Sequence, residues 1–138
     1  MKTFQFRFVA LSSVIYEGTI VSVSFPGVSG DVEIYADHAP AMFLLRPGAI
    51  KVSLSDGSQR LFCVERGLVQ VLKNSVVALV NRAINSGEID IDVLSKRSKE
   101  LRELTQTQLS SKTKEKIFRR LSYLEEQSKI AKRIQAEK

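Results

Sequence analysis

The chain has 138 residues, of which 43% are hydrophobic and 26% are charged, and this composition excludes an intrinsically disordered chain. No apolar run reaches the about 18–20 residues of a membrane span, and the first residues lack the apolar core of a signal peptide, so we expect neither. The net charge of +6 is uneven, because residues 1–88 carry +1 and residues 89–138 carry +5. The C-terminal part is therefore expected to meet an acidic partner.

Residues 1–88 show the alternation of apolar and polar residues that predicts β-strands. The alternation begins at residues 4–8 and recurs at 19–25. Its apolar positions are Phe4, Phe6, Phe8, Val21, Val23 and Phe25. Two hairpins are predicted next, one turning at Asp56-Gly57 and the other at Lys73-Asn74, because these residue types suit tight turns between strands.

Two Pro-Gly pairs, Pro26-Gly27 and Pro47-Gly48, mark further turns, since proline presets φ and glycine accepts positive φ. Turn signals that recur about every 10 residues are typical of a small antiparallel sandwich or barrel. The single cysteine, Cys63, lies in the strand-like segment "LFCVE". We expect it to be a buried structural thiol.

The hydrophobic period changes near residue 88 and predicts two helices, over about residues 91–104 and 113–134, with Asp90 as the first N-cap. Small and apolar residues form a narrow seam on the second helix, and further apolar residues widen it. The seam is Ile117, Leu121, Leu124, Ser128 and Ala131, and the widening residues are Phe118, Tyr123, Ile130 and Ile134. The predicted class is α+β by segments, an N-terminal antiparallel β-sandwich followed by a C-terminal two-helix hairpin. The hairpin either packs on itself and on the sandwich, or is held loosely enough to open.

His38 is the single histidine of the chain and follows Asp37, which raises the question of a catalytic or metal site. One histidine without further ligands is no zinc site, because zinc needs several protein ligands. The sequence has no glycine-rich phosphate loop and no nucleophile elbow. We therefore expect no catalytic residue, no metal and no cofactor.

A run of basic residues opens the second predicted helix. Its members are Lys112, Lys114, Lys116, Arg119 and Arg120. One aromatic residue, Phe118, lies among them, and no recognised DNA- or RNA-binding motif is present. Composition favours a protein partner and leaves a basic nucleic-acid-binding protein, built of β-structure and helices, as the alternative.

The stretch "FPGVSGDVEIYADHAPAMFLLRPGAIKV", residues 25–52, resembles the signature of the epsilon subunit of F-type ATP synthases through the spacing of its His-Ala-Pro and Pro-Gly segments. The residues that fit are Gly30, Asp31, Ile34, His38, Ala39, Pro40, Leu45, Pro47, Gly48 and Ile50. The segment "VERGLVQVLKNSVVALVNRAI" resembles the hairpin that follows in the family. The change to helices also falls where the family has it, so the resemblance covers nearly the whole chain.

The resemblance implies a non-catalytic rotor subunit of the bacterial type. The sandwich, residues 1–88, would dock on the gamma subunit and the ring of c subunits and help couple proton flow to ATP synthesis. Asp31 matches the position that contacts the polar loops of the c subunits, although a turn carboxylate that caps nearby N–H groups is the alternative. His38, Ala39 and Pro40 match the position that lies against gamma.

For the helical hairpin, residues 89–138, the resemblance implies a regulatory element. In members that inhibit, the hairpin opens along gamma toward an acidic segment of the catalytic beta subunits and blocks ATP hydrolysis, a partner that would suit the basic run. A rotor clamp without inhibition is the other interpretation. No nucleic acid partner is implied. Membrane association is expected only through the complex, at the cytoplasmic face of the bacterial inner membrane.

Some members of the family bind ATP through an [IL]-D-x-x-R-A motif, and here the sequence departs from the pattern. Ile89 and Asp90 match, whereas Val93 and Leu94 replace the arginine and the alanine. Because the missing arginine is the natural partner of a phosphate, nucleotide binding is expected to be weak or absent. Asp37 stands where many members have glycine, and its role is unassigned.

Overall fold

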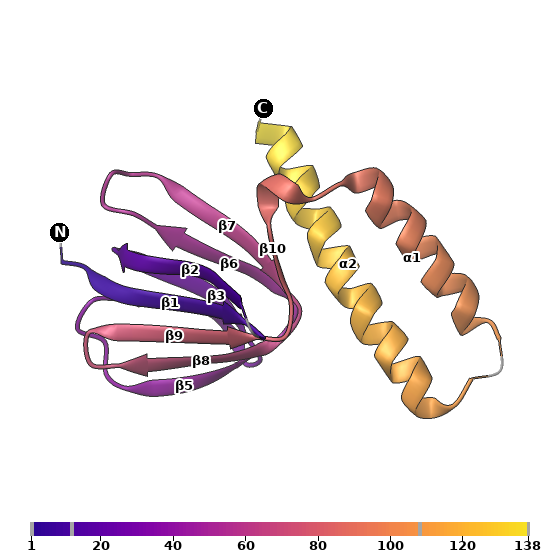
Figure 1. Ribbon diagram of the computed structural model, residues 1–138, viewed down its shortest axis with the longest axis horizontal. Helices are drawn as coiled ribbons and strands as arrows, with labels where there is room; N and C mark the ends of the chain where they lie inside the picture. The colour runs from indigo at the N-terminus through magenta and orange to yellow at the C-terminus, as the bar shows by residue number, and fades with distance from the viewer. Residues whose placement is uncertain (1, 12, 108, 138) are drawn as a thin grey trace.

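The computed structural model describes the backbone of residues 2–11, 13–107 and 109–137, and the side chains of these residues up to Ile134. Within them the chain forms a β-sandwich followed by a helical hairpin that stands beside one end of the sandwich (Figure 1). The strands are β1 (Phe4–Ala10), β2 (Ser13–Ile20), β3 (Ser22–Gly27), β4 (Gly30–Tyr35), β5 (Ala41–Leu45), β6 (Gly48–Ser53), β7 (Gln59–Val64), β8 (Gly67–Leu72), β9 (Ser75–Val80) and β10 (Ala83–Asn85). The helices are the short η1 (Ser86–Glu88), α1 (Ile91–Thr105) and α2 (Ser111–Glu137).

The strands form one hydrogen-bonded series that folds over on itself. Its order is β10-β7-β6-β3-β5-β8-β9-β1-β2, and β4 pairs with the free side of β3. A single residue pair, Gly27 with Leu45, joins β3 to β5 and so connects the two layers. The predicted α+β class with an N-terminal sandwich is confirmed. The pairing of β1 with β9 is parallel, however, which the alternation of side chains could not reveal.

The sandwich core contains the residues that the alternation selects. Phe4, Phe6 and Phe8 point inward from β1 while Gln5 and Arg7 point outward. The fully buried Phe8 ring meets Phe62 of β7 edge-on, with ring centroids 5.2 Å apart. Such edge-to-face packing adds to the stabilisation that comes from burial of the rings. The strands of both layers thus share one apolar core.

Two sequence expectations in the first half of the sandwich were wrong in detail. Residues 19–25 do not form one strand, because β2 ends at Ile20 and β3 begins at Ser22, with the half-buried Val21 at the corner between them. Pro26-Gly27 is no turn, because it ends β3 and the turn falls at Val28-Ser29. A Cβ on Gly27 would lie 2.6 Å from the Gly30 carbonyl oxygen, so the close approach of the two strands requires glycine.

The two predicted hairpins are confirmed, with β6 and β7 joined through Asp56-Gly57 and β8 and β9 through Lys73-Asn74. Gly57 and Asn74 adopt φ values of 87° and 67°, in the left-handed region that glycine and asparagine tolerate best. The local sequence therefore determines the register of both hairpins.

The hairpin of α1 and α2 packs on itself and on the sandwich, which is the first of the two expected arrangements. The Asp90 carboxylate caps α1 by accepting from the backbone N–H groups of Asp92 and Val93, at 3.0 and 3.2 Å. Most of the predicted seam on α2 is buried, and Ser128 is half-buried. Tyr123 and Ile130 bury a second face of α2 against Cys63 of β7. Cys63 has no exposed surface, so the prediction of a buried thiol is confirmed.

Candidate functional site

Asp31, near the start of β4, is exposed to solvent and is held by a contact with Arg46. Arg46, which follows β5, donates from Nη2 to Asp31 Oδ1 at 2.5 Å. The backbone holds the two elements together, since the Val28 N–H donates to the Leu44 carbonyl and the Arg46 N–H donates to the Pro26 carbonyl. The Asp31 side chain remains 81% exposed, so the second carboxylate oxygen can still accept from a partner.

His38 lies at the other end of β4, in the loop that leads to β5. Its Nδ1 is 2.7 Å from the Ala39 carbonyl oxygen. A carbonyl can only accept, so Nδ1 is the donor in this contact. His38, Ala39 and Pro40 are all exposed. The structure therefore places Asp31 and the His38 loop at opposite ends of one strand, not in one cluster.

Asp37 makes its contact with Lys2, not with His38. Its carboxylate lies 2.7 Å from the Lys2 Nζ, and this contact raises the pKa of the Lys2 ammonium group. The backbone of Asp37 has φ 63°, in the left-handed region. That conformation suits glycine best and is tolerated by aspartate. Asp37 thus shapes the loop and does not activate the imidazole.

A row of apolar side chains crosses the outer face of the layer that contains β5, β8, β9, β1 and β2. Direct strand pairing connects Leu44 to Leu68, Leu68 to Leu79, Leu79 to Val9 and Val9 to Val14. Paired residues on neighbouring strands point to the same face. The residues beside them in sequence point into the core, as Phe8 and Ala78 do. We call these five residues the apolar row.

Three of the five residues of the apolar row are exposed, whereas Val9 and Leu68 are half-buried. Leu44, Leu79 and Val14 are 64%, 46% and 49% exposed, and Met42, on the same face of β5, is 62% exposed. A shallow cavity of about 340 Å³ between the β3–β4 turn and β5 is lined by Leu44, Met42 and Asp31. The row and the carboxylate therefore form one continuous surface. A contiguous exposed apolar patch beside polar groups is typical of a protein interface.

Sequence reasoning missed the apolar row and Arg46. The segment "AMFLL" of β5 did contain a signal, because five successive apolar residues give a strand two apolar faces. One face fills the core, so the other needs a partner. The full row depends on the pairing of strands that are distant in sequence, which no local pattern provides.

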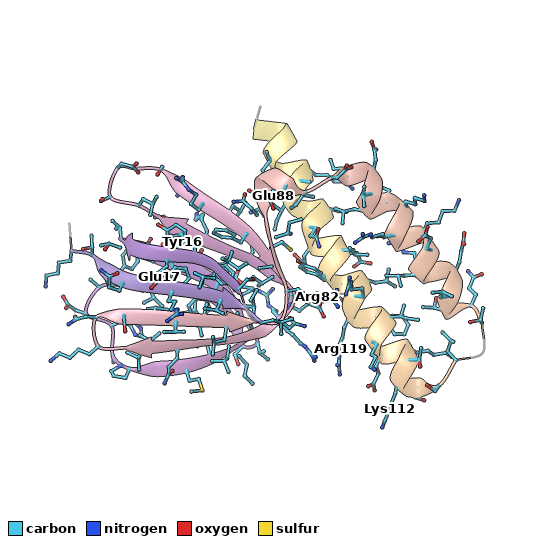
Figure 2. All side chains as sticks on the ribbon, in the orientation of Figure 1. Tyr16, Glu17, Arg82, Glu88, Lys112 and Arg119 are labelled. Atoms are coloured by element: carbon cyan, nitrogen blue, oxygen red, sulfur yellow. The ribbon has the colours of Figure 1, made fainter. Side chains whose placement is uncertain are left out.

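The predicted basic run lies on the first turns of α2, and Lys112 and Arg119 extend from the helix into solvent (Figure 2). The run does not form one face. Lys116, Arg119 and Arg120 border a cleft toward the sandwich, whereas Lys112 lies outside the set of residues that line it.

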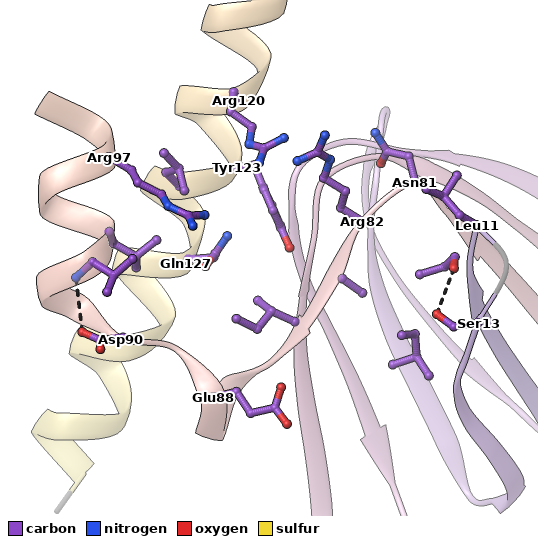
Figure 3. Close-up of a pocket in the computed structure, with 17 residues that line it drawn as sticks. Leu11, Ser13, Asn81, Arg82, Glu88, Asp90, Arg97, Arg120, Tyr123 and Gln127 are labelled. Atoms are coloured by element: carbon purple, nitrogen blue, oxygen red, sulfur yellow. Dashed lines mark hydrogen bonds between the residues drawn. The ribbon is translucent and has the colours of Figure 1, made fainter. Parts of the chain in front are cut away.

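A cavity of about 540 Å³ lies where the start of α1 meets the sandwich and α2 (Figure 3). Arg82, Arg97 and Arg120 point into it. Asp90 uses its carboxylate as a helix cap, and Leu94 is buried at 5% exposure. The four positions of the nucleotide-binding motif therefore supply a helix cap and three apolar side chains. Ile89 packs toward Cys63, and Val93 lies in the lining of the cavity.

Within the part of the chain that the structure describes, no three His, Cys, Asp or Glu side chains gather closely enough to hold a metal ion. The described helices also include none long and apolar enough to cross a membrane.

Comparisons with known proteins identify the family. Residues 3–86 match the sequence model described as "ATP synthase, Delta/Epsilon chain, beta-sandwich domain". The ATP synthase epsilon chain of Nitratiruptor sp. is 30% identical over 112 residues, which cover 81% of this chain and 87% of that protein. The chain belongs to the ATP synthase epsilon-chain family. The resemblance that the His-Ala-Pro and Pro-Gly spacing indicated is therefore confirmed.

Two solved structures share the fold of this epsilon-family chain. One is the OSCP/F1/c-ring structure of the Euglena gracilis mitochondrial ATP synthase. The matching chain is 18% identical, the TM-score is 0.78, and the match covers 90% of this chain and 78% of the matching chain. The other is the central stalk/c-ring of the Tetrahymena thermophila mitochondrial ATP synthase, with a TM-score of 0.70, 15% identity and coverage of 94% and 97%. The likeness extends over the sandwich and the hairpin together.

Proposed function

We propose that this chain is a non-catalytic rotor subunit in the central stalk of an F-type ATP synthase, where it links gamma to the c ring and helps couple proton translocation to ATP synthesis. Membership of the epsilon-chain family supports this role. So does the likeness of the fold to chains solved within a central stalk/c-ring assembly. Family membership also removes the reason to consider the nucleic-acid alternative.

The gamma subunit is the proposed partner of the apolar row and of His38, Ala39 and Pro40. The row is the main support for this proposal. Burying its exposed leucine and valine side chains against a partner stabilises the complex by about 25 cal/mol for each Å² of apolar surface removed from water. The exposed imidazole of His38, whose Nδ1 is engaged with the Ala39 carbonyl, offers its second ring nitrogen for a polar contact with gamma. An apolar centre with a polar rim is the usual composition of a stable interface.

The c ring is the proposed partner of Asp31. Its carboxylate is held in place by Arg46 and has an oxygen free to accept from a basic or amide group of a polar loop. A charge-assisted hydrogen bond of this kind fixes orientation as well as adding affinity. The alternative is a carboxylate that caps the N–H groups of its own turn. Among the described residues, Asp31 makes no hydrogen bond of that kind.

Binding to purified gamma tests the proposal. Leu79→Asp places a charge in the middle of the apolar row, between Leu68 and Val9, and is expected to weaken binding at least about 100-fold, since central apolar residues dominate interface energetics. Leu104→Asp, on α1, is the control, because Leu104 is 48% exposed and lies outside the row. Equal affinity of the Leu79→Asp variant and the parent chain would contradict the proposal.

We further propose a functional division between residues 1–88, which dock, and residues 89–138, which regulate. The basic run offers several cations to an acidic segment of the beta subunits, and polar residues such as Ser98 and Gln127 are buried in the hairpin's contacts. Because these contacts include polar residues, the docked and opened states of the hairpin are expected to differ little in free energy. Deletion of residues 89–138 is expected to raise ATP hydrolysis by the assembled enzyme. Unchanged hydrolysis would leave the hairpin as a clamp only.

The proposed location is the cytoplasmic face of the bacterial inner membrane, as a peripheral protein held through gamma and the c ring. Extraction of membranes with a chelator at low salt, which detaches peripheral complexes, tests this placement. We expect the chain to leave the membrane together with gamma.

A further inference from the structure

A cleft of about 740 Å³ separates one end of the sandwich from the helical hairpin, and its lining is strongly charged. The sandwich contributes Glu65, Arg66 and Arg82, and the hairpin contributes Arg97, Glu100, Lys116, Arg119 and Arg120. Cations therefore outnumber carboxylates in the lining. The charges on the two sides of this cleft therefore affect the free energy of docking of the hairpin on the sandwich.

Glu65 is the buried carboxylate of this cleft, at 7% exposure. Its Oε1 accepts from Asn81 Nδ2 at 3.2 Å. Its Oε2 lies 3.5 Å from Arg82 Nε, and no group among the described residues makes a hydrogen bond to it. A buried carboxylate oxygen without a hydrogen bond is costly and normally has a donor near by.

Arg120 of α2 is the candidate for that donor because it lines the same cleft. Its guanidinium makes no ion pair with Glu65 in the structure, so the contact requires a rotation of the Arg120 side chain. Arg82 and Arg120 line both this cleft and the neighbouring cavity, and their guanidinium groups point toward each other (Figure 3). Two guanidinium groups that face each other repel unless a carboxylate lies between them. Tyr123, one turn along α2 from Arg120, is close enough to Glu65 for that charge to help burial raise the pKa of its phenol. Glu65 thus lies within the electrostatic reach of α2.

We propose that Glu65 is an electrostatic latch for the hairpin, in which its Oε2 accepts a charge-assisted hydrogen bond from the Arg120 guanidinium and so bridges Arg82 of the sandwich to α2. The apolar contacts of Tyr123 and Ile130 with Cys63 stabilise the docked hairpin by burying apolar surface. The latch adds an interaction that depends on one carboxylate. The proposed regulatory role rests on the docking equilibrium that this latch would shift.

Cys63 provides a direct measurement of docking on the intact, isolated chain. The thiol is fully buried beneath α2, and its Sγ lies 4.0 Å from the Tyr123 carbonyl oxygen. Burial raises its pKa to about 12, so the docked thiol is protonated and shielded at pH 8. The rate of its reaction with a thiol reagent such as 5,5′-dithiobis-(2-nitrobenzoate) therefore reports how often α2 leaves the sandwich.

The experiment compares Glu65→Gln, Arg120→Gln and the double variant with the parent chain. We expect each single variant to react about five- to tenfold faster, because a hydrogen bond to a charged group is lost, and the double variant to react no faster than either single one. Glu17→Gln, on β2 away from the hairpin, and Lys112→Gln, at the start of α2, are the matched controls and should react at the parent rate (Figure 2).

The opposite sign would overturn the latch. If Glu65 is only an unpaired buried charge, glutamine relieves its desolvation and the Glu65→Gln variant reacts more slowly than the parent. Equal rates, or additive effects in the double variant, would also overturn it. Amide hydrogen exchange of Phe8 and Ala78 in the sandwich core shows whether a faster thiol reaction comes from undocking of α2 or from unfolding of the whole chain. Because these assays need no ATP synthase, a failed latch leaves the deletion test of hydrolysis intact.

Discussion

Arg46 holds Asp31 through a 2.5 Å contact between Nη2 and Oδ1, across a turn and a strand end that are fifteen residues apart. Both side chains are largely exposed, at 43% and 81%. Exposed ion pairs contribute little to stability. The contact therefore matters chiefly because it fixes the direction in which the carboxylate faces the proposed c-ring partner.

Substitutions of Asp31 and Arg46 distinguish two contributions to binding of the c ring, the charge of the Asp31 carboxylate and its orientation. Asp31→Asn should weaken binding to a purified c ring about 10-fold and make the remaining affinity less sensitive to salt, because a charge-assisted contact is lost. Arg46→Gln should weaken it less, since the carboxylate remains but is free to rotate. Asp56→Asn, on the exposed β6–β7 turn, is the matched control. Affinity that is unchanged in Asp31→Asn would show that the residue serves only its own turn.

Asp37 is expected to respond to substitution according to its backbone conformation. The φ of Asp37 is 63°, a value that glycine adopts without steric strain. Asp37→Gly loses only an exposed contact to Lys2, so the free energy of unfolding should stay within about 0.5 kcal/mol of the parent value. Asp37→Val should lower it by about 1–2 kcal/mol, since a β-branched residue is strained there. Urea unfolding measures both values. A valine variant as stable as the parent would show that the loop relaxes freely.

Alkaline pH should loosen the contact between α2 and the sandwich. Burial raises the pKa of Cys63 from an ordinary value near 9 to about 12, and burial also raises the pKa of Tyr123. Below pH 9 the thiol is protonated in both the folded and the unfolded chain, so its contribution is fully present. Above pH 9 only the unfolded chain releases the proton, and the free energy of unfolding falls by at most about 1.4 kcal/mol per pH unit for this group.

Thermal melts between pH 8 and pH 11, followed by circular dichroism, measure this effect. The Cys63→Ala variant is the control, because it lacks the thiol and should lose stability more slowly as the pH rises. Parallel pH profiles for the two chains would assign the alkaline loss to other groups.

Nucleotide binding is expected to be weak or absent. Asp90 is engaged as a helix cap and Val93 brings no cation to the site. Calorimetric titration of the isolated chain with ATP should therefore show no saturable heat at micromolar concentrations, while Val93→Arg, which supplies the missing phosphate partner, should bind more tightly. Micromolar affinity of the parent chain would mean that Arg97 and Arg120 replace the absent motif residue.

The sequence by itself determined the elements of this protein, because each depends on neighbours along the chain. Alternation placed Phe4, Phe6 and Phe8 in the core, and turn chemistry at Gly57 and Asn74 set two hairpins. Asp90 marked the start of α1. The signature of residues 25–52 also identified the family, because its spacing is a property of sequence alone.

Only the tertiary structure decided what these elements present to a partner. The apolar row exists because β5, β8, β9, β1 and β2 pair in a register that brings together side chains from five separate segments. The cleft that Glu65 and Arg120 both line likewise depends on how α2 docks on the sandwich. Such relationships come from long-range packing, in which burial of the whole core fixes the geometry, and no local pattern of residues contains them.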